Sequence, residues 1–363
     1  MKKIFFIINC FSKGGGAESL LAQIVNRLNP QKYEIGIMEI IHDNIKEEKL
    51  NSNIRLYPYY VEANADNRKE KMYYVYHEWD KVIDEYIPND FDVYISFNYL
   101  KPTFLLPRGK KCIAWIHGDM YNLSKENMIE ERMLQKNAFE KVEKIIAISD
   151  ITYQSIIDLY PEYKEKVVLL CNGIDVKRVR TLSMEKTDIR LKHPAILSVG
   201  RLDDNKNPLR LLHIFSKVLE QFPEAQLYYM GYGNQSEKVC EISTKLNISQ
   251  SVHLLGYHDN PFPIIRQCDV IGMFSKSEGF PMALLEGVAL GKPFVSSLFG
   301  GARILSNMYG CGAVVDTDVE ATEAISRFIT MEKTSVTHLC EKTIKEFDIS
   351  HYIEKIEKII DTI

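Results

Sequence analysis

Short apolar runs of strand length alternate along the chain with stretches of helix-forming residues. The first run, at 4–8, is unbroken, β-branched and aromatic, which is typical of a central parallel strand buried on both faces. After a polar, basic stretch at 173–192, the same rhythm restarts with a second apolar run at 195–199. Two successive series of strands and helices predict an α/β protein. We expect two doubly wound, parallel-sheet, Rossmann-like domains that face a central cleft.

The pattern predicts individual elements in both halves. Expected strands lie at 4–8, 33–40, 53–56, 91–97, 111–116, 144–148, 166–170, 195–199, 226–230, 253–255, 269–274 and 312–315, with another after Pro293. Expected helices lie at 17–28, 68–86, 125–143, 208–221, 235–246, 261–267, 282–290, 320–331, 335–346 and 351–362, with a further helix capped by Ser149 and Asp150.

Composition narrows the class of protein. A length of 363 residues with 45% hydrophobic residues suits two domains, and a net charge of −4 argues against a dedicated nucleic-acid binder. The seven cysteines include no CxxC pair, so we expect reduced thiols rather than a zinc or thioredoxin-like site. No apolar run approaches the ~18 residues of a membrane span, and the run at 4–8 is too short for a signal peptide. We therefore expect a cytoplasmic protein, at most peripheral to the inner face of the cell membrane.

The stretch 275–297 carries the most informative chemistry. Gly279 and Pro281 lie in a loop that leads into the helix at 282–290, and seven residues separate Glu278 from Glu286. Unpartnered amides and the dipole at a helix start favour a phosphate, and the two carboxylates could accept hydroxyls on either side of it. A nucleotide sugar has this layout. Alternatively, one glutamate caps the helix and the other is a solvated surface residue.

Other candidate groups follow predicted strands, where open α/β sheets bind ligands. Gly14, Gly15 and Gly16 precede a helix and form either an anion cradle or a plain flexible turn. His117 follows a buried strand, as a ligand-facing or a structural imidazole. Arg201 and Lys206 bracket one loop, where they suit a diphosphate or are simply solvated.

Several motifs fall in order along the chain. They are Gly14-Gly15-Gly16 with Glu18, His117-Gly118, Asn172-Gly173-Ile174-Asp175, Gly200-Arg201, Lys206-Asn207, Gly231 with Gly233, Glu278-Gly279-Phe280-Pro281 with Glu286, and Gly291-Lys292-Pro293. With these motifs, the chain resembles the family-4 retaining glycosyltransferases of GT-B fold (glycosyl transferases group 1) over nearly its whole length.

The resemblance implies a function and a role for each matched residue. The domain at 1–172 would bind the acceptor, and residues 347–363 would cross back to it. The domain at 173–346 would bind a nucleotide sugar, preferably a UDP-sugar. No metal or other cofactor is implied. The implied catalytic residues are His117, Arg201, Lys206 and Glu278. The implied donor-binding residues are Gly15, Gly16, Gly200, Gly231, Tyr257, Gly279, Phe280, Pro281, Met282, Ala283 and Glu286.

Two departures from the family pattern concern the same region. Gly287 stands where the family often has Ala, and Ile304 stands where a Glu often braces the site, so the bracing of that loop needs another explanation. The expected acceptor is a glycan or lipid-linked glycan of bacterial surface polysaccharide or glycoconjugate synthesis.

Other interpretations of the chain stay open. The aromatics at 73–79 and the cations Lys101, Arg108, Lys110 and Lys111 suggest peripheral contact with an anionic membrane, or core packing for the aromatics. The alternatives to a transferase are a nucleotide-sugar epimerase of GT-B fold and a non-catalytic binding subunit.

Overall fold

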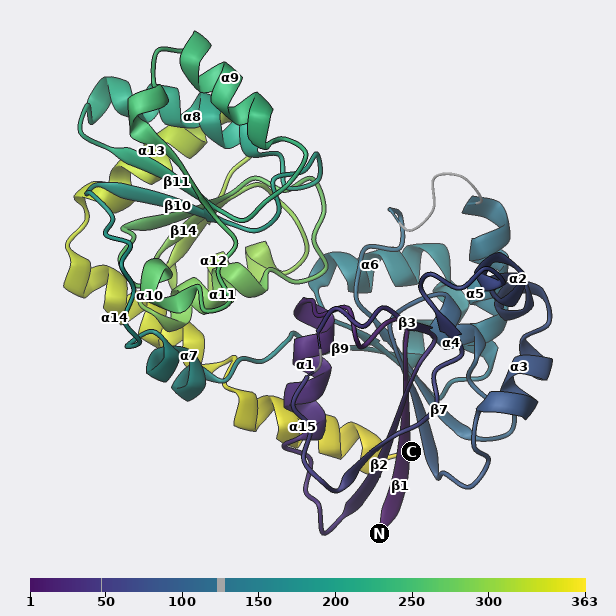
Figure 1. Ribbon diagram of the computed structural model, residues 1–363. Coiled ribbons are helices and arrows are strands. Elements are labelled where there is room, and N and C mark those ends of the chain that lie inside the picture. Colours follow the sequence, from purple (N-terminus) through teal and green to yellow (C-terminus); the bar gives the residue numbers. More distant parts are fainter. Residues whose placement is uncertain (47, 123–127) are drawn as a thin grey trace. The chain divides into compact units, whose positions relative to one another are not determined.

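The computed structural model describes residues 1–46, 48–122 and 128–363, which form two compact units. The N-terminal unit comprises Met1–Cys171 together with Ile353–Ile363, and the C-terminal unit comprises Asn172–Tyr352 (Figure 1). The boundaries predicted from the sequence lie at 172/173 and 346/347.

The N-terminal unit is built on a seven-stranded parallel sheet of order β4-β2-β1-β6-β7-β8-β9. Its strands are β1 (Lys2–Ile8), β2 (Tyr33–Glu39), β4 (Ile54–Leu56), β6 (Val93–Phe97), β7 (Lys111–Ile116), β8 (Lys144–Ala147) and β9 (Val167–Leu169). Residues Ile4 to Ile8 of β1 are fully buried, which confirms the two-sided burial expected of a central strand. The chain order changes direction at β1 and β6, so ligand-facing loops are expected where these two strands end.

Helices and a small strand pair cover this sheet (Figure 1). They are α1 (Gly16–Val25), α2 (Arg68–His77), α3 (Trp79–Tyr86), α4 (Lys101–Phe104), α5 (Met128–Glu140), α6 (Asp150–Leu159) and a 3-10 turn (Pro161–Lys166), with β3 (Ile41–His42) paired to β5 (Val61–Glu62). The β3–β5 pair was not among the predicted elements. Residues 125–127 of the helix predicted at 125–143 lie outside the described residues.

The helix predicted at 68–86 is wrong as a single element. It breaks at Glu78, whose φ of −133° and ψ of 42° are not helical. The break turns Tyr76 and Trp79 onto the ring of Phe104, at centroid distances of 5.7 and 5.5 Å, while Tyr73 is 55% exposed. Most of the aromatic stripe therefore packs against the unit, as the core alternative predicted.

The C-terminal unit has a six-stranded parallel sheet of order β12-β11-β10-β13-β14-β15. Its strands are β10 (Ala195–Val199), β11 (Gln226–Met230), β12 (Val252–Gly256), β13 (Val270–Met273), β14 (Phe294–Ser296) and β15 (Gly312–Val314). Its helices are α7 (Val176–Leu182), α8 (Pro208–Gln221), α9 (Ser236–Lys245), α10 (Phe262–Ile265), α11 (Met282–Ala289), α12 (Ala302–Tyr309), α13 (Asp318–Thr330) and α14 (Lys333–Lys345). Figure 1 shows α8, α9 and α13 on one face of the sheet and α11, α12 and α14 on the other.

Two stretches of this unit differ from the sequence expectation. The polar stretch at 173–192 contains α7, because the side chain of Asp175 caps it by accepting a hydrogen bond from the backbone N–H of Arg178 at 2.8 Å. The helix α12 was not predicted, and the positive φ angles of Gly301 and Gly310 mark its two ends.

The last helix, α15 (Ile349–Asp361), returns the chain to the N-terminal unit. There the hydroxyl of Tyr33 donates to Asp361 at 2.8 Å, and the ammonium of Lys2 donates to the carbonyl of Ile360 at the same distance. Among the helices in the described part of the chain, none has the length and apolarity needed to cross a membrane.

Candidate functional site

Two loops of the C-terminal unit meet where the adjacent strands β10 and β13 end. The loop at 200–207 follows β10, and the loop at 274–281 follows β13. The backbone N–H of Lys276 donates to the carbonyl of Asn205 at 2.7 Å, and the side-chain amide of Asn205 donates to the carbonyl of Ser277 at 2.9 Å. These two bonds fix one loop against the other.

An ion pair joins predicted site residues across these loops. The ammonium of Lys206 lies 2.7 Å from Oε1 of Glu278, and the two side chains are only 23% and 16% exposed. This oxygen is buried and the contact lacks hydrogen-bond geometry, so Oε1 keeps capacity to accept a hydrogen bond. Because both side chains are largely shielded from water, removal of either one should lower the stability of the folded protein.

Arg201 has a different partner. Its guanidinium is 74% exposed, and its Nε lies 2.7 Å from Oδ2 of Asp203. The other oxygen of Asp203 accepts a hydrogen bond from the backbone N–H of Lys206 at 2.8 Å. The carboxylate of Asp203 therefore connects the two predicted cations: it contacts the guanidinium of Arg201 and the backbone N–H of Lys206.

Glycines bring the backbones of β10, β11 and β12 close together at the same sheet edge. A Cβ at Gly231, whose φ is +144°, would lie 2.0 Å from the carbonyl oxygen of Gly200. Only glycine tolerates this approach and conformation. Gly231 also bridges to Gly256, the last residue of β12, and the following Tyr257 is 63% exposed.

The loop in front of α11 presents amide groups. Among the described residues, the N–H groups of Gly279 and Phe280 have no hydrogen-bond partner. Phe280 is 7% exposed, and a Cβ at Gly301 would lie 2.5 Å from its ring. The aromatic ring packed on Gly301 thus braces this loop, where the family pattern led us to look for a carboxylate at Ile304. Pro281 precedes the first helical residue, Met282.

The helix α11 lies close against its sheet. A Cβ at Gly287 would come 2.1 Å from Cδ1 of Ile271 on β13, which explains why glycine replaces alanine there. Glu286, on the same helix, is half-buried, and burial raises its pKa to about 7 although the charge of Arg178 opposes the shift. Met282 and Ala283 are also half-buried.

His117 belongs to the N-terminal unit and follows β7. Its ring lies 4.3 Å from the ring of Phe97, and its Nε2 is buried without a hydrogen-bond partner. Burial lowers the pKa of the imidazole to about 3, so the ring is neutral at physiological pH.

The glycine loop of the N-terminal unit is covered by its own helix. Gly15 caps α1, and the carboxylate of Glu18 in the first turn of that helix lies beside it. A Cβ at Gly15 would lie 2.5 Å from Oε2 of Glu18, whereas one at Gly16 would meet open space. An anion approaching Gly15 therefore meets a carboxylate first.

The structure brings together the predicted residues of the C-terminal unit: Gly200, Lys206, Gly231 and Glu278 lie around one sheet edge. His117, Gly15 and Gly16 belong to the other unit. Sequence reasoning missed Asn205, which carries no signal of its own because its role depends on a loop about 70 residues away. No cluster of three or more metal-ligating side chains occurs among the residues that the structure describes.

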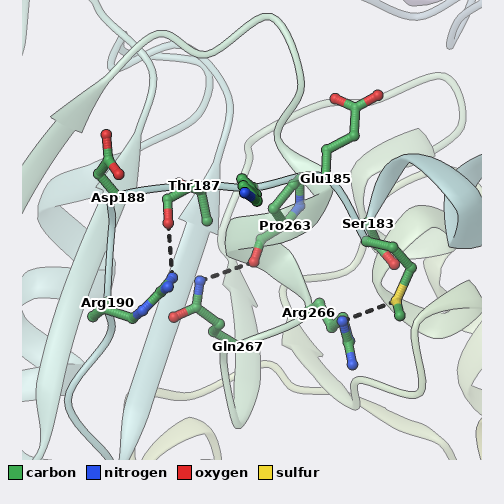
Figure 2. Close-up of a pocket in the computed structure, with 10 residues that line it drawn as sticks. Ser183, Glu185, Thr187, Asp188, Arg190, Pro263, Arg266 and Gln267 are labelled. Carbon is green, nitrogen blue, oxygen red and sulfur yellow. Dashed lines mark hydrogen bonds between the residues drawn. The ribbon is translucent and has the colours of Figure 1, made fainter.

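A separate hollow of about 610 Å³ in the C-terminal unit contains none of the predicted site residues. Figure 2 shows Arg190 donating to the carbonyl of Thr187 and Gln267 donating to that of Pro263.

Comparisons with known proteins identify both halves of the chain. The sequence model described as "Glycosyl transferases group 1" matches residues 179–346, and the model described as "Glycosyltransferase Family 4" matches residues 14–178.

Individual relatives agree with these matches. A Campylobacter jejuni protein, N-acetylgalactosamine-N,N'-diacetylbacillosaminyl-diphospho-undecaprenol 4-alpha-N-acetylgalactosaminyltransferase, is 28% identical over 202 residues, or 55% of this chain and 54% of the relative. The chain spans about half the length of the first curated relatives that it matches.

Solved structures show the same fold. A sucrose-phosphate synthase from Thermosynechococcus elongatus is 14% identical with a TM-score of 0.77, over 99% of both chains. An Anabaena protein, HepE, crystallised with UDP-glucose, is 15% identical with a TM-score of 0.71, over 100% of both chains. These findings confirm the predicted family and fold: the chain belongs to glycosyltransferase family 4 and has the GT-B fold.

Proposed function

We propose that the protein is a retaining glycosyltransferase that moves a sugar from a UDP-sugar to a glycan or lipid-linked glycan acceptor. No metal ion takes part in this proposal, because lysine and arginine side chains supply the positive charge near the leaving diphosphate. The observation that carries the proposal is the mostly buried ion pair of Lys206 and Glu278, beside amides with no partner among the described residues.

Lys206 and Arg201 are assigned to the diphosphate. When the bond between the sugar carbon and the diphosphate oxygen breaks, negative charge builds on the leaving group, and preorganised cations lower the barrier most at that point. In the free protein Glu278 neutralises Lys206, and Asp203 neutralises Arg201. Donor binding places phosphate oxygens within reach of both cations, while the N–H groups of Gly279 and Phe280 donate to the ligand.

The two glutamates are assigned to hydroxyls. Oε1 of Glu278 has free accepting capacity and would bind hydroxyls of the donor sugar, setting its pose. Glu286 would bind the ribose from α11, next to Met282 and Ala283, and Pro281 would set the start of that helix. The base would lie against the backbone near Tyr257, and Gly200 and Gly231 would leave room for the donor.

The N-terminal unit is assigned to the acceptor side. His117 would contact the donor sugar as a neutral imidazole, able to donate or accept a hydrogen bond. Gly15 and Gly16 would approach the donor phosphate or the acceptor, which requires the side chain of Glu18 to turn away from Gly15. The acceptor hydroxyl would bond to the sugar carbon on the face that the diphosphate leaves, which retains the anomeric configuration.

The relatives support the choice of donor and acceptor. One structural relative holds UDP-glucose, and one sequence relative is named for transfer to a sugar on diphospho-undecaprenol. We extend both features to this chain, in bacterial surface polysaccharide or glycoconjugate synthesis at the inner face of the cell membrane.

A thermal-unfolding measurement with UDP in excess EDTA tests the donor assignment. UDP is expected to raise Tm because it binds only the folded state. Arg201→Ala should abolish most of this rise. Arg190→Ala, an exposed arginine of the same unit outside the proposed site, should leave it intact. A rise that requires Mg²⁺, or that survives in Arg201→Ala, would contradict the metal-independent assignment.

A further inference from the structure

The N-terminal unit contains a polar cavity of its own, at the point where β1 and β6 end. It has a volume of about 420 Å³, and residues that follow these two strands line it together with α2 and α5. Its charged and aromatic lining consists of Lys13, Glu18, Tyr76, Tyr99, Lys101 and Glu131. We call this cavity the N-terminal pocket.

Strained backbone forms one wall of the N-terminal pocket. Leu100 has φ 58° and ψ −116°, a conformation that favours glycine and is unfavourable for a bulky residue. Its backbone N–H donates to the side-chain oxygen of Gln135, which is fully buried, at 2.8 Å. A buried amide thus holds the strained residue in place, as is common where a fold positions groups for a ligand.

Two charged groups in this pocket lack the partners that burial normally demands. Oε2 of Glu131 is buried without a hydrogen bond, while Oε1 accepts one from the hydroxyl of Tyr76 at 3.4 Å. The ammonium of Lys101 lies 5.9 Å from the ring centre of Tyr76 and has no hydrogen bond or ion pair among the described residues. Desolvation by burial lowers the pKa of Lys101. Such groups are costly unless a ligand satisfies them.

The charge balance indicates what kind of ligand this is. The lining holds two lysines, Lys13 and Lys101, and two glutamates, Glu18 and Glu131, so that their formal charges cancel. For each lysine that attracts a phosphate or carboxylate, the lining also holds one glutamate that repels it. A hydroxylated ring can satisfy both, because each hydroxyl donates to one group and accepts from another.

We propose that the N-terminal pocket binds an uncharged sugar, with Glu131 accepting and Lys101 donating hydrogen bonds to its hydroxyls. Tyr76 and Tyr99 add aromatic surface on which the apolar face of the ring packs. The identification of this sugar as the acceptor rests on the proposed function. The binding of the sugar does not, and it can be measured without a donor.

Saturation-transfer NMR with methyl glycosides tests the binding directly. The probes are the methyl glycosides of glucose, galactose, N-acetylglucosamine and N-acetylgalactosamine, and inorganic phosphate is tested by chemical shift. We expect at least one glycoside to receive saturation from the wild-type protein, with the signal lost in Glu131→Gln. Glu130→Gln is the matched control, because Glu130 is the neighbouring, 56%-exposed residue of α5 and lies outside the pocket lining.

The outcomes separate this inference from the proposed function. If no glycoside binds, if phosphate binds instead, or if Glu131→Gln and Glu130→Gln behave alike, the sugar pocket is wrong whatever the protein does with UDP-sugars. If a glycoside binds through Glu131 but no UDP-sugar is consumed, the pocket stands and the proposed function fails. Where both hold, the ratio of transfer to donor hydrolysis should fall about tenfold in Glu131→Gln and not in Glu130→Gln.

Discussion

The loop at 274–281 and the helix α11 that follows it hold their glutamates in opposite surroundings. Glu278, in the loop, has an ammonium 2.7 Å from its carboxylate. Glu286, on the helix, forms no ion pair among the described residues, and burial raises its pKa to about 7. Two residues of one sequence motif therefore differ in what compensates their charge. The spacing of a motif predicts where carboxylates lie, whereas the packing around each one determines whether a cation lies close enough to compensate its charge.

The largest expected effect comes from removing the cation of the loop region. Lys206→Met should lower the rate of donor hydrolysis by about 100–1000-fold, because one preorganised partner of the developing charge is lost. A coupled assay for released UDP measures this rate. Lys217→Met is the control, since Lys217 pairs with Glu220 on the exposed surface of α8. A loss of less than about tenfold would remove Lys206 from its proposed role.

The second effect concerns the stability of the same ion pair. Lys206→Met and Glu278→Gln should each destabilise the free protein, because each leaves a mostly buried charge without its partner. The double variant should be less destabilised than the sum, with a coupling of about 1–3 kcal/mol in urea unfolding. If the two changes in the free energy of unfolding simply add, the interaction between Lys206 and Glu278 does not stabilise the protein.

The third effect concerns Glu286 and depends on pH. The folded-state pKa of about 7 exceeds the ordinary 4.5, so the folded protein holds this proton more tightly than the unfolded chain does. Stability contributed by the protonated form is therefore present below about pH 4.5 and is lost as pH rises through about 7. Glu286→Gln removes this dependence, so it should stabilise the protein by about 1–3 kcal/mol above pH 7 and not in acid. Equal Tm differences at both ends of this range would contradict the raised pKa.

The smallest expected effect concerns the titration of His117 in the N-terminal unit, which we compare with that of Glu286. Burial acts on His117 with the opposite sign, because the charged form of histidine is the protonated one. With a pKa of about 3, its ring signals should not shift between neutral pH and about pH 5. Histidine ring NMR measures this, with exposed His213 as the internal reference. A midpoint near the ordinary 6.5 would place the ring in contact with water.

The sequence predicted the repeating parts of the fold well. The bounds of β10, β11 and α8 agree with the prediction residue by residue, because strongly apolar runs end at glycine or proline. The interruption at Glu78 was not predictable in this way, since α2 has little hydrophobic periodicity and no proline marks the break. The helix α12 is strongly amphipathic, but with only eight residues it is too short for that period to stand out in the sequence.

The candidate site was only half predictable. The residue types and their order indicated Lys206 and Glu278, but nothing local shows that these two side chains pair with each other rather than with solvent. The link through Asn205 and the N-terminal pocket around Leu100 both depend on contacts between distant segments. Such features follow from tertiary packing, which a single sequence does not reveal.

Donor hydrolysis in EDTA tests the central claim most directly. The wild-type protein is incubated with UDP-, GDP-, ADP- and dTDP-sugars, and the products are followed by proton NMR. We expect a UDP-sugar to be cleaved without metal, with the released sugar appearing first in the anomeric configuration of the donor, and Lys206→Met to slow the reaction by about 100–1000-fold. Conversion of the donor to an isomeric UDP-sugar would indicate an epimerase, and cleavage only with added metal, or of no donor, would contradict the account.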